Sequence, residues 1–153
     1  MAITKRFKKN EVIFREGDNE DFMYDIWSGK VGIYSEYKTP AQKLLVTLES
    51  EDVFGEMGMI EQLPRSATAV ALEDTQASVI SYENFKEFIS EKPAKAYTIL
   101  QHTSSRLRDL SLDYVEACAV IAEYVNAEKN GEKPSAELMA KLKKIDGARK
   151  KNK

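Results

Sequence analysis

The sequence predicts a mainly β domain followed by C-terminal helices, and a change of hydrophobic period supports this prediction. Up to about Ser81, short apolar or alternating runs are interrupted by turn residues every few positions, which is typical of a compact antiparallel β unit. From Tyr82 onward the apolar residues recur with a helical period. At 153 residues the chain is long enough for one domain with a helical extension.

The β unit is expected to contain seven or eight short strands. We expect them at 4–7, 12–14, 22–27, 31–37, 43–49, 67–73 and 76–81, with a short run at 52–54 leading into the stretch that follows. In 67–73 alanine alternates with threonine, valine and leucine, so both faces are fairly apolar and an interior strand is indicated. Trp27 lies in an apolar alternation and is predicted to belong to the core.

Two helices are predicted directly after the strands. Phe85, Phe88 and Ile89 share one face of a short helix within 82–92, and Pro93 separates it from a much longer helix. From 94 to about 129 there is neither proline nor glycine. Gly131 ends this long helix.

A last short helix is predicted through about Ile145. Pro134 precedes it, and Ser135 is its candidate N-cap. These boundaries divide the chain into a β domain with a short helix at 1–92, a long helix at 93–130, and a short helix with a basic tail at 131–153.

The long helix carries an apolar seam with a seven-residue period. Leu100, Leu107, Tyr114 and Ile121 recur every seven residues, and three residues after each stand Thr103, Leu110, Ala117 and Tyr124. The seam either packs on its own β domain or pairs with a second helix. A helix of this length measures about 54 Å at 1.5 Å per residue and outruns so small a domain. We therefore expect a homodimer through 94–129, with an unidentified protein partner as the other occupant.

Composition excludes several classes of function. The net charge is −2, so no overall field favours nucleic acid or an anionic membrane, although seven basic residues against Asp146 alone make 141–153 a basic tail. Cys118 and His102 are the only cysteine and histidine, which argues against disulfides and His/Cys metal sites and favours a reducing cytoplasmic location. No run approaches the ~20 apolar residues of a membrane span.

The stretch GEMGMIEQLPRSA, residues 55–67, fits neither ordinary core nor ordinary surface. Gly55 and Gly58 allow a sharp turn and a close backbone approach. Met57 and Met59 give residues 57–62 an apolar underside, which predicts a short helix docked on the core. We therefore expect a bend that presents the following arginine to a ligand.

The polar residues of this stretch indicate which ligand. Amide groups at the start of the short helix and the planar guanidinium of Arg65 suit a phosphate. Ser66 adds a hydroxyl donor, and Ala67 keeps the space open. Glu56 would repel a lone anion, but its carboxylate can accept hydrogen bonds from hydroxyl groups such as those of ribose. The chemistry indicated is a sugar attached to a phosphate.

The segment FGEMGMIEQLPRSATAV resembles the phosphate-binding cassette of the cyclic nucleotide-binding domains, the family of the bacterial catabolite activator protein and of the regulatory subunits of cAMP-dependent protein kinase. FKKNEVIFREGD, MYDIWSGKVGIY and DVFGE stand in the family's order and spacing, and the resemblance covers residues 4–115. Asn10 stands where the family usually has glycine, an exchange that asparagine permits because it tolerates a left-handed conformation.

The resemblance implies a β-roll jelly roll, or double-stranded β-helix, followed by a long C-helix and a short terminal helix. Its ligand would be cAMP or cGMP, with Glu56 on the ribose 2′-hydroxyl and Arg65 on the cyclic phosphate. The binding set it implies comprises Gly55, Glu56, Met57, Gly58, Arg65, Ser66 and Ala67. Tyr114 could stack on the purine and Arg108 or Asp113 could bond its edge, or all three are seam and solvated positions. No catalytic or metal-binding residue is expected.

We therefore expect a cytoplasmic sensor or regulatory module that binds a cyclic mononucleotide, with cAMP favoured, and acts through helix rearrangement. One alternative is a relative of the transcription regulators without their helix-turn-helix, since only 132–153 follow the long helix and specific DNA binding is not expected. Another is an interaction module that has lost nucleotide binding, in which Arg65 and Glu56 form a salt bridge on a surface turn. A cupin-like enzyme is disfavoured because its metal site needs several histidines.

Overall fold

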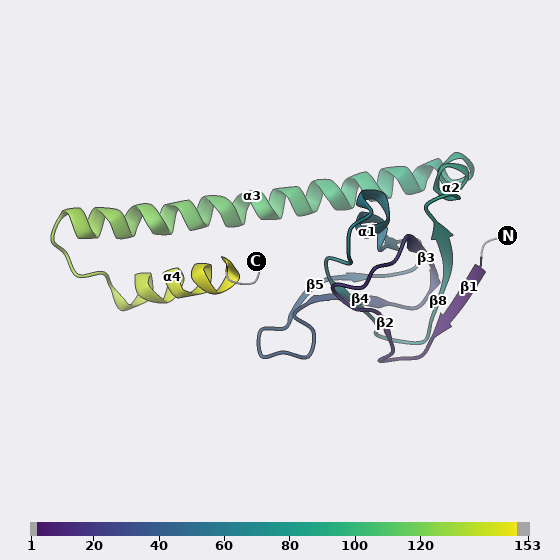
Figure 1. Cartoon of the computed structure of the whole chain (residues 1–153), viewed down its shortest axis with the longest axis horizontal. Coiled ribbons are helices and arrows are strands. Elements are labelled where there is room, and N and C mark those ends of the chain that lie inside the picture. The colour runs from purple at the N-terminus through teal and green to yellow at the C-terminus, as the bar shows by residue number, and fades with distance from the viewer. Residues whose placement is uncertain (1–2, 150–153) are drawn as a thin grey trace. The chain divides into compact units, whose positions relative to one another are not determined.

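The strands and helices of the computed structural model, which describes residues 3–149, follow the expected order (Figure 1). The strands are β1 (Ile3–Phe7), β2 (Val12–Phe14), β3 (Phe22–Ser28), β4 (Val31–Ser35), β5 (Lys43–Leu48), β6 (Val53–Phe54), β7 (Thr68–Ala71) and β8 (Thr75–Ser81). The helices are α1 (Glu56–Glu61), α2 (Phe85–Glu91), α3 (Pro93–Lys129) and α4 (Ala136–Arg149). The chain divides into two compact units after Gln101, and α3 runs from the first into the second.

The strands of the first unit form two four-stranded antiparallel sheets, one in the order β1-β8-β3-β6 and the other in the order β2-β7-β4-β5. This is the predicted β-roll. β7 lies inside its sheet and all four of its residues are buried, which confirms the interior strand. β4 ends two residues earlier than predicted because Glu36 adopts a left-handed φ of 53°, which ends the extended conformation.

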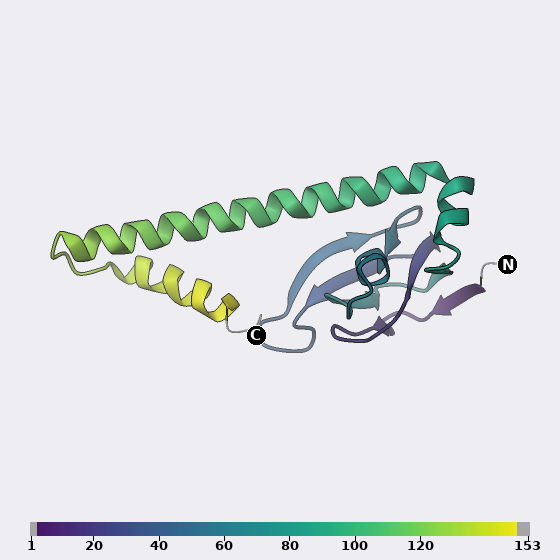
Figure 2. The same ribbon diagram turned by 45° about the horizontal axis from the view of Figure 1, so that its top comes forward.

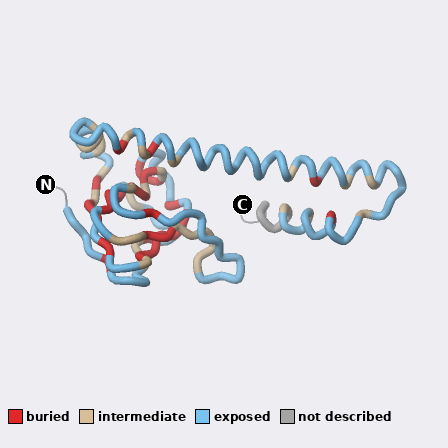
Figure 3. The backbone as a smooth tube through the Cα atoms, turned by 180° about the vertical axis from the view of Figure 1, so that it is seen from behind, coloured by how far each residue is buried: buried red, intermediate tan, exposed pale blue. Residues whose placement is uncertain are grey.

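The main core lies between the two sheets, and every one of the eight strands contributes a buried side chain to it: Phe7, Phe14, Tyr24, Ile26, Val31, Leu48, Phe54, Ala69, Ala71 and Ala77. Tyr24 stacks on Phe54 with 4.9 Å between ring centroids, and Phe14 packs beside both rings. Small alanines on β7 and β8 leave room for these rings. Figure 3 shows the buried residues concentrated in this part of the chain.

A second buried cluster joins helices α1 and α3 to strands of the sheet β1-β8-β3-β6. It contains Met23 from β3, Val53 from β6, Met59 from α1, Ile80 from β8 and Ile99 from α3. The predicted apolar face of α2, formed by Phe85, Phe88 and Ile89, packs against this cluster. The short helix of the candidate site and the start of the long helix therefore share one set of packed side chains.

Several predicted turn and cap residues are confirmed. Asn10 has a φ of 69°, the left-handed conformation expected of it, and its amide donates to Ala71 O at 2.7 Å. Gly131 ends α3 with a φ of 69°. Ser135 caps α4, because its Oγ accepts a hydrogen bond from the amide of Leu138 at 3.1 Å.

The prediction that Trp27 belongs to the core is wrong. Its side chain is 58% exposed, whereas the preceding Ile26 is buried in the main core. Side chains alternate along β3, with Tyr24 and Ile26 in the main core and Met23 on the opposite face, so Trp27 falls on the opposite face, where it is exposed at the end of the strand.

The long helix exposes most of its seam. Leu100, Leu107, Leu110 and Tyr114 are each at least 65% exposed, and it is Ile99, not Leu100, that docks on the β-roll. In the second unit α4 turns back beside α3 (Figures 1 and 2). Each of these two helices has one buried apolar residue in this unit, Val120 on α3 and Leu138 on α4, among the residues that the structure describes. Of the predicted basic tail, Lys150, Lys151 and Lys153 lie outside the described residues.

Candidate functional site

The residues predicted to bind a ligand lie on one connection, between β6 and β7. It consists of Gly55, the short helix α1 and an extended segment that leads to Arg65. The predicted apolar underside of α1 is confirmed in Met59, which is completely buried, while Met57 is half-buried. Because α1 is held to the core on this side, the arginine that follows it has a fixed position.

Gly55 brings the backbone close to Arg65. It precedes α1 with a left-handed φ of 80°, and a Cβ atom added at this position would stand 2.7 Å from Arg65 Nη1. Its carbonyl oxygen accepts a hydrogen bond from the same nitrogen at 2.5 Å. Gly58 is also close, since a Cβ there would lie 3.5 Å from Arg65 Cδ. The two glycines and the arginine therefore lie close together in the structure.

Replacing Gly55 with alanine is expected to lower the free energy of unfolding by more than the backbone conformation alone requires. A left-handed alanine costs about 1–2 kcal/mol, and the new methyl group would also displace the Arg65 guanidinium. Gly17→Ala is the matched control, because Gly17 has a similar φ of 87° but nothing within 4 Å of its added Cβ. Urea denaturation of both variants measures the difference, and equal losses would contradict the close approach.

Arg65 is buried, and four of the five N–H donors of its guanidinium bond protein groups. Its guanidinium donates to Glu20 Oε2 from Nε at 3.3 Å and from Nη2 at 3.1 Å, to Phe22 O from Nη2, and to Gly55 O from Nη1. It lies over the Phe14 ring, 4.3 Å from the centroid. Its side chain is 1% exposed, whereas that of Glu20 is 27% exposed.

The turn between β2 and β3 holds Glu20 beside this arginine. The amide of Arg65 donates to Asp18 O at 2.9 Å, and the amide of Gly17 donates to Arg65 O at 2.8 Å. Asp18 closes the turn by accepting a hydrogen bond from the amide of Arg15 at 2.7 Å. Backbone hydrogen bonds thus fix the two segments to each other independently of the ion pair.

Glu56 has a different environment. It is the first residue of α1, is 8% exposed and, within the described part of the chain, forms no hydrogen bond or ion pair through its carboxylate. Its oxygens are not among the buried side-chain atoms without a hydrogen-bond partner in the described residues, so solvent reaches them. The carboxylate of Glu56 is therefore available to accept hydrogen bonds from the hydroxyl groups of a ligand.

The alternative in which Arg65 and Glu56 form a salt bridge on a surface turn is wrong. The ionic partner of Arg65 is Glu20, and the arginine is buried because Phe14 and Phe22 cover it. Of the remaining predicted residues, Ser66 directly follows the arginine and is exposed, whereas Ala67, the next residue, is buried. Sequence reasoning missed Glu20, and its only signal was the acidic run around the Gly17–Asp18 turn.

The environment of Tyr24 agrees with this arrangement. Burial and the charge of Glu20 raise the pKa of Tyr24 to about 12, and the charge of Arg65 opposes that rise. The phenol of Tyr24 therefore loses its proton only in strong alkali.

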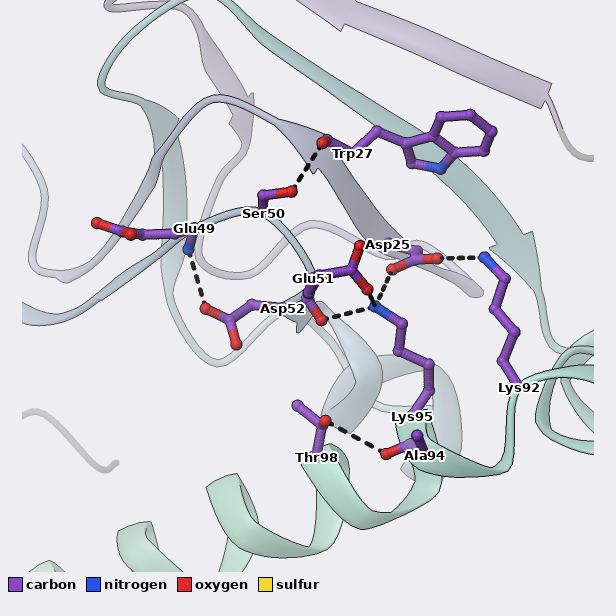
Figure 4. A network of polar contacts seen from close by, with 10 residues as sticks. All are labelled: Asp25, Trp27, Glu49, Ser50, Glu51, Asp52, Lys92, Ala94, Lys95 and Thr98. Carbon is purple, nitrogen blue, oxygen red and sulfur yellow. Dashed lines mark hydrogen bonds and ion pairs between the residues drawn. The ribbon is translucent and has the colours of Figure 1, made fainter.

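A second polar cluster lies where α2 meets α3 (Figure 4). Asp25 on β3 is buried, and its two carboxylate oxygens lie 2.9 Å from Lys92 Nζ and 2.8 Å from Lys95 Nζ. Lys95 also donates to the backbone oxygen and the carboxylate of Glu51, at 2.6 and 3.1 Å. A pocket of about 240 Å³ beside the cluster is lined by Asp25, Ile26, Trp27, Glu51 and Lys92 and contains none of the predicted site residues.

Comparison with known proteins gives the class. Residues 4–92 match the family model described as the cyclic nucleotide-binding domain. The cyclic AMP receptor protein of Thermus thermophilus is 30% identical over 107 residues, which are 70% of this chain and 50% of that protein. The chain thus spans about half the length of this curated relative.

Solved structures agree with the family match. A crystal structure of the Thermus thermophilus catabolite activator protein superposes with a TM-score of 0.65 at 28% identity, covering 92% of this chain and 71% of that chain. A structure described as cAMP-bound PfPKA-R has a TM-score of 0.53 at 32% identity and covers 60% of this chain and 34% of that one. The chain belongs to the cyclic nucleotide-binding domain family.

Two further properties of the described residues concern metal binding and membrane insertion. Among residues 3–149 no group of three or more His, Cys, Asp or Glu side chains is placed to hold a metal ion. None of the helices that the structure describes combines the length and the apolar character needed to cross a membrane.

Proposed function

We propose that this domain binds a cyclic mononucleotide, with cAMP favoured over cGMP, and acts as a cytoplasmic regulatory module and not as an enzyme. The observation that carries the proposal is the pair of groups on the β6–β7 connection. Arg65 is a buried cation suited to a phosphate, and Glu56 carries a carboxylate with no protein partner, which is available to sugar hydroxyls. The relatives named for cAMP support the choice of purine.

In this proposal the binding unit is residues 1–92. Arg65 binds the cyclic phosphate and Glu56 the ribose 2′-hydroxyl. Gly55, Met57, Gly58 and Ala67 shape the wall around them, and the exposed Ser66 hydroxyl reaches the phosphate from the solvent side. Gly55 is necessary because a side chain there would collide with the guanidinium.

Calorimetric titration of the purified chain with cAMP, cGMP and a cyclic dinucleotide tests this function. Saturable binding of one molecule of cAMP per chain, tighter than binding of cGMP, is the expected result. Binding of the cyclic dinucleotide alone would overturn the ligand class. The function would be overturned if none of the three ligands bound either to the parent protein or to a folded Glu20→Gln variant.

An interaction module that binds no nucleotide is the second candidate, and the Arg65–Glu20 ion pair favours it. A guanidinium that is already satisfied by Glu20, Phe22 O and Gly55 O can serve the fold alone, as a link between the β2–β3 turn and the β6–β7 connection. The carboxylate of Glu56 favours the first candidate over this one, because it has no protein partner and is available to the hydroxyl groups of a ligand.

The output is proposed to pass through the helices. Met59 of α1 and Ile99 of α3 belong to the same buried cluster, so a shift of α1 around a bound phosphate would change the packing against the start of α3. Such a shift becomes a signal if α3 holds a second copy of the chain. We assign that dimerisation role to 93–130, on the evidence of its exposed apolar seam.

Leu107→Asp is expected to convert a dimer into a monomer, because it places a charge in the middle of the exposed seam, where Leu107 is 65% exposed in the single chain. Ser105→Asp adds the same charge on the opposite side of the helix and is expected to leave the dimer intact. Light scattering coupled to size-exclusion chromatography measures both. A monomeric parent protein, or a Leu107→Asp variant that stays dimeric, would contradict the pairing role.

A further inference from the structure

Arg65 already has an anionic partner in the chain itself, and this has a consequence for any ligand that the arginine binds. Two of its N–H donors point to the same oxygen of Glu20. A carboxylate and a cyclic phosphodiester each carry one negative charge and present oxygen acceptors, so both suit the same edge of a guanidinium.

The contacts of the rest of the guanidinium allow one anion to replace another at the edge formed by Nε and Nη2. The carbonyl oxygens of Phe22 and Gly55 accept from Nη2 and Nη1, and Phe14 packs against its face. These contacts fix the plane of Arg65 without using Nε. A change of anion therefore requires movement of the carboxylate and leaves the arginine in place.

Glu20 is the member of the pair that is free to move. Its side chain is 27% exposed, it lies at the end of the β2–β3 turn, and only its Oε2 is engaged with Arg65. The backbone hydrogen bonds between this turn and Arg65 involve Gly17 and Asp18 and not the Glu20 side chain. The carboxylate can rotate into solvent while the turn keeps its position.

From these contacts we propose that Glu20 is an internal competitor for the phosphate site, so that a nucleotide binds only by displacing its carboxylate from Arg65. The inference rests on the proposed function, since it concerns the same arginine. Only molecules in which the Glu20 carboxylate has left Arg65 can bind the nucleotide. The apparent affinity is therefore the intrinsic affinity multiplied by the fraction of molecules in that state. It sets the ligand concentration at which the domain responds.

Glu20→Gln tests this inference, because glutamine keeps the shape of the side chain and removes its charge. We expect the affinity for cAMP in calorimetry to rise roughly tenfold or more. We also expect the ligand-free variant to melt at a lower temperature, because Arg65 loses its ionic partner, and the upward shift of the melting temperature on adding cAMP to be larger than in the parent protein.

Asp21→Asn is the matched control. Asp21 is the neighbouring exposed carboxylate, and its side chain forms no hydrogen bond with Arg65. This substitution removes the same charge from the same turn and is expected to change the affinity less than threefold, roughly the effect of a distant surface charge.

The outcomes separate the inference from the function on which it rests. Tighter binding by Glu20→Gln than by the parent protein, or binding by this variant alone, supports the competitor. Equal or weaker binding by the variant overturns it and leaves the proposed function standing, with Glu20 as a residue that positions Arg65. If neither the parent protein nor the folded variant binds any of the three nucleotides, both proposals fail together.

Discussion

Arg65→Ala is expected to abolish binding of cyclic nucleotide, with a loss of about 2–5 kcal/mol in binding free energy, because it removes the cation that pairs with a partly buried phosphate. The same change leaves Gly55 O and Phe22 O without their side-chain donor, so the free energy of unfolding also falls. Calorimetry at a temperature well below the melting transition measures the first effect, and urea denaturation measures the second.

Arg65→Lys separates charge from geometry. Lysine keeps the positive charge but cannot bond two backbone carbonyls and an anion in one plane. We therefore expect this variant to bind cyclic nucleotide more weakly than the parent protein but more tightly than Arg65→Ala. An Arg65→Lys variant that binds as tightly as the parent protein would show that the planar contacts are unnecessary. An Arg65→Ala variant that is folded and still binds would remove Arg65 from the site.

Lys95→Met is expected to lower the free energy of unfolding by about 1–3 kcal/mol, because it leaves the buried Asp25 carboxylate with only one of its two ammonium partners. Methionine is of similar length and fills the same space, so the loss reports the ion pair and not a cavity. The measurement is urea denaturation followed by circular dichroism.

Lys92→Met is the control for this prediction. Lys92 pairs with the other oxygen of Asp25, but its side chain is 45% exposed, so a loss of about 1 kcal/mol or less is expected. The double variant Asp25→Leu/Lys95→Met should recover much of the stability, because it removes both buried charges. Equal losses in the two lysine variants would show that burial does not decide the strength of these pairs.

The pH dependence of the Lys95 contribution has a definite sign. Burial of the ammonium disfavours its charged form, but hydrogen bonds and charges from Asp25 and Glu51 outweigh burial and raise the pKa of Lys95 above its ordinary value of 10.5. A lysine whose pKa is raised by folding stabilises the protein fully below the unfolded value and loses that effect as pH rises through the folded value. The difference between the parent protein and Lys95→Met should therefore be constant at neutral pH and shrink only in strong alkali.

The elements themselves were largely predictable because their signals are local. Strand alternation, the helical period after Tyr82, and the Gly131 and Ser135 boundaries all act within a few residues of the chain. Trp27 is misplaced because both faces of β3 are apolar, and the sequence does not show that the face carrying Met23 and Trp27 is covered at Met23 and exposed at Trp27. Likewise the heptad pattern alone does not distinguish Ile99, which docks on the β-roll, from Leu100 beside it.

The polar partners were harder to predict because they are far apart in sequence. Arg65 and Glu20 are separated by 45 residues, and only the backbone bonds of the β2–β3 turn bring them together. Asp25 gave a partial signal, since one acid inside the apolar run FMYDIWS implies a buried charge that needs a cation. The choice of Lys92 and Lys95 follows from how α2 and α3 pack on β3, which tertiary structure decides.

The outward position of Trp27 provides the protein with an intrinsic optical reporter. It is the single tryptophan of the chain, and its ring lies 5.9 Å from the ammonium of Lys92, at the junction that connects the β-roll to α3. Emission excited at the red edge of protein absorbance therefore comes from one known place. Rearrangement of that junction would change the wavelength or intensity of the emission, so a ligand response can be followed in real time on the unlabelled, unmodified chain.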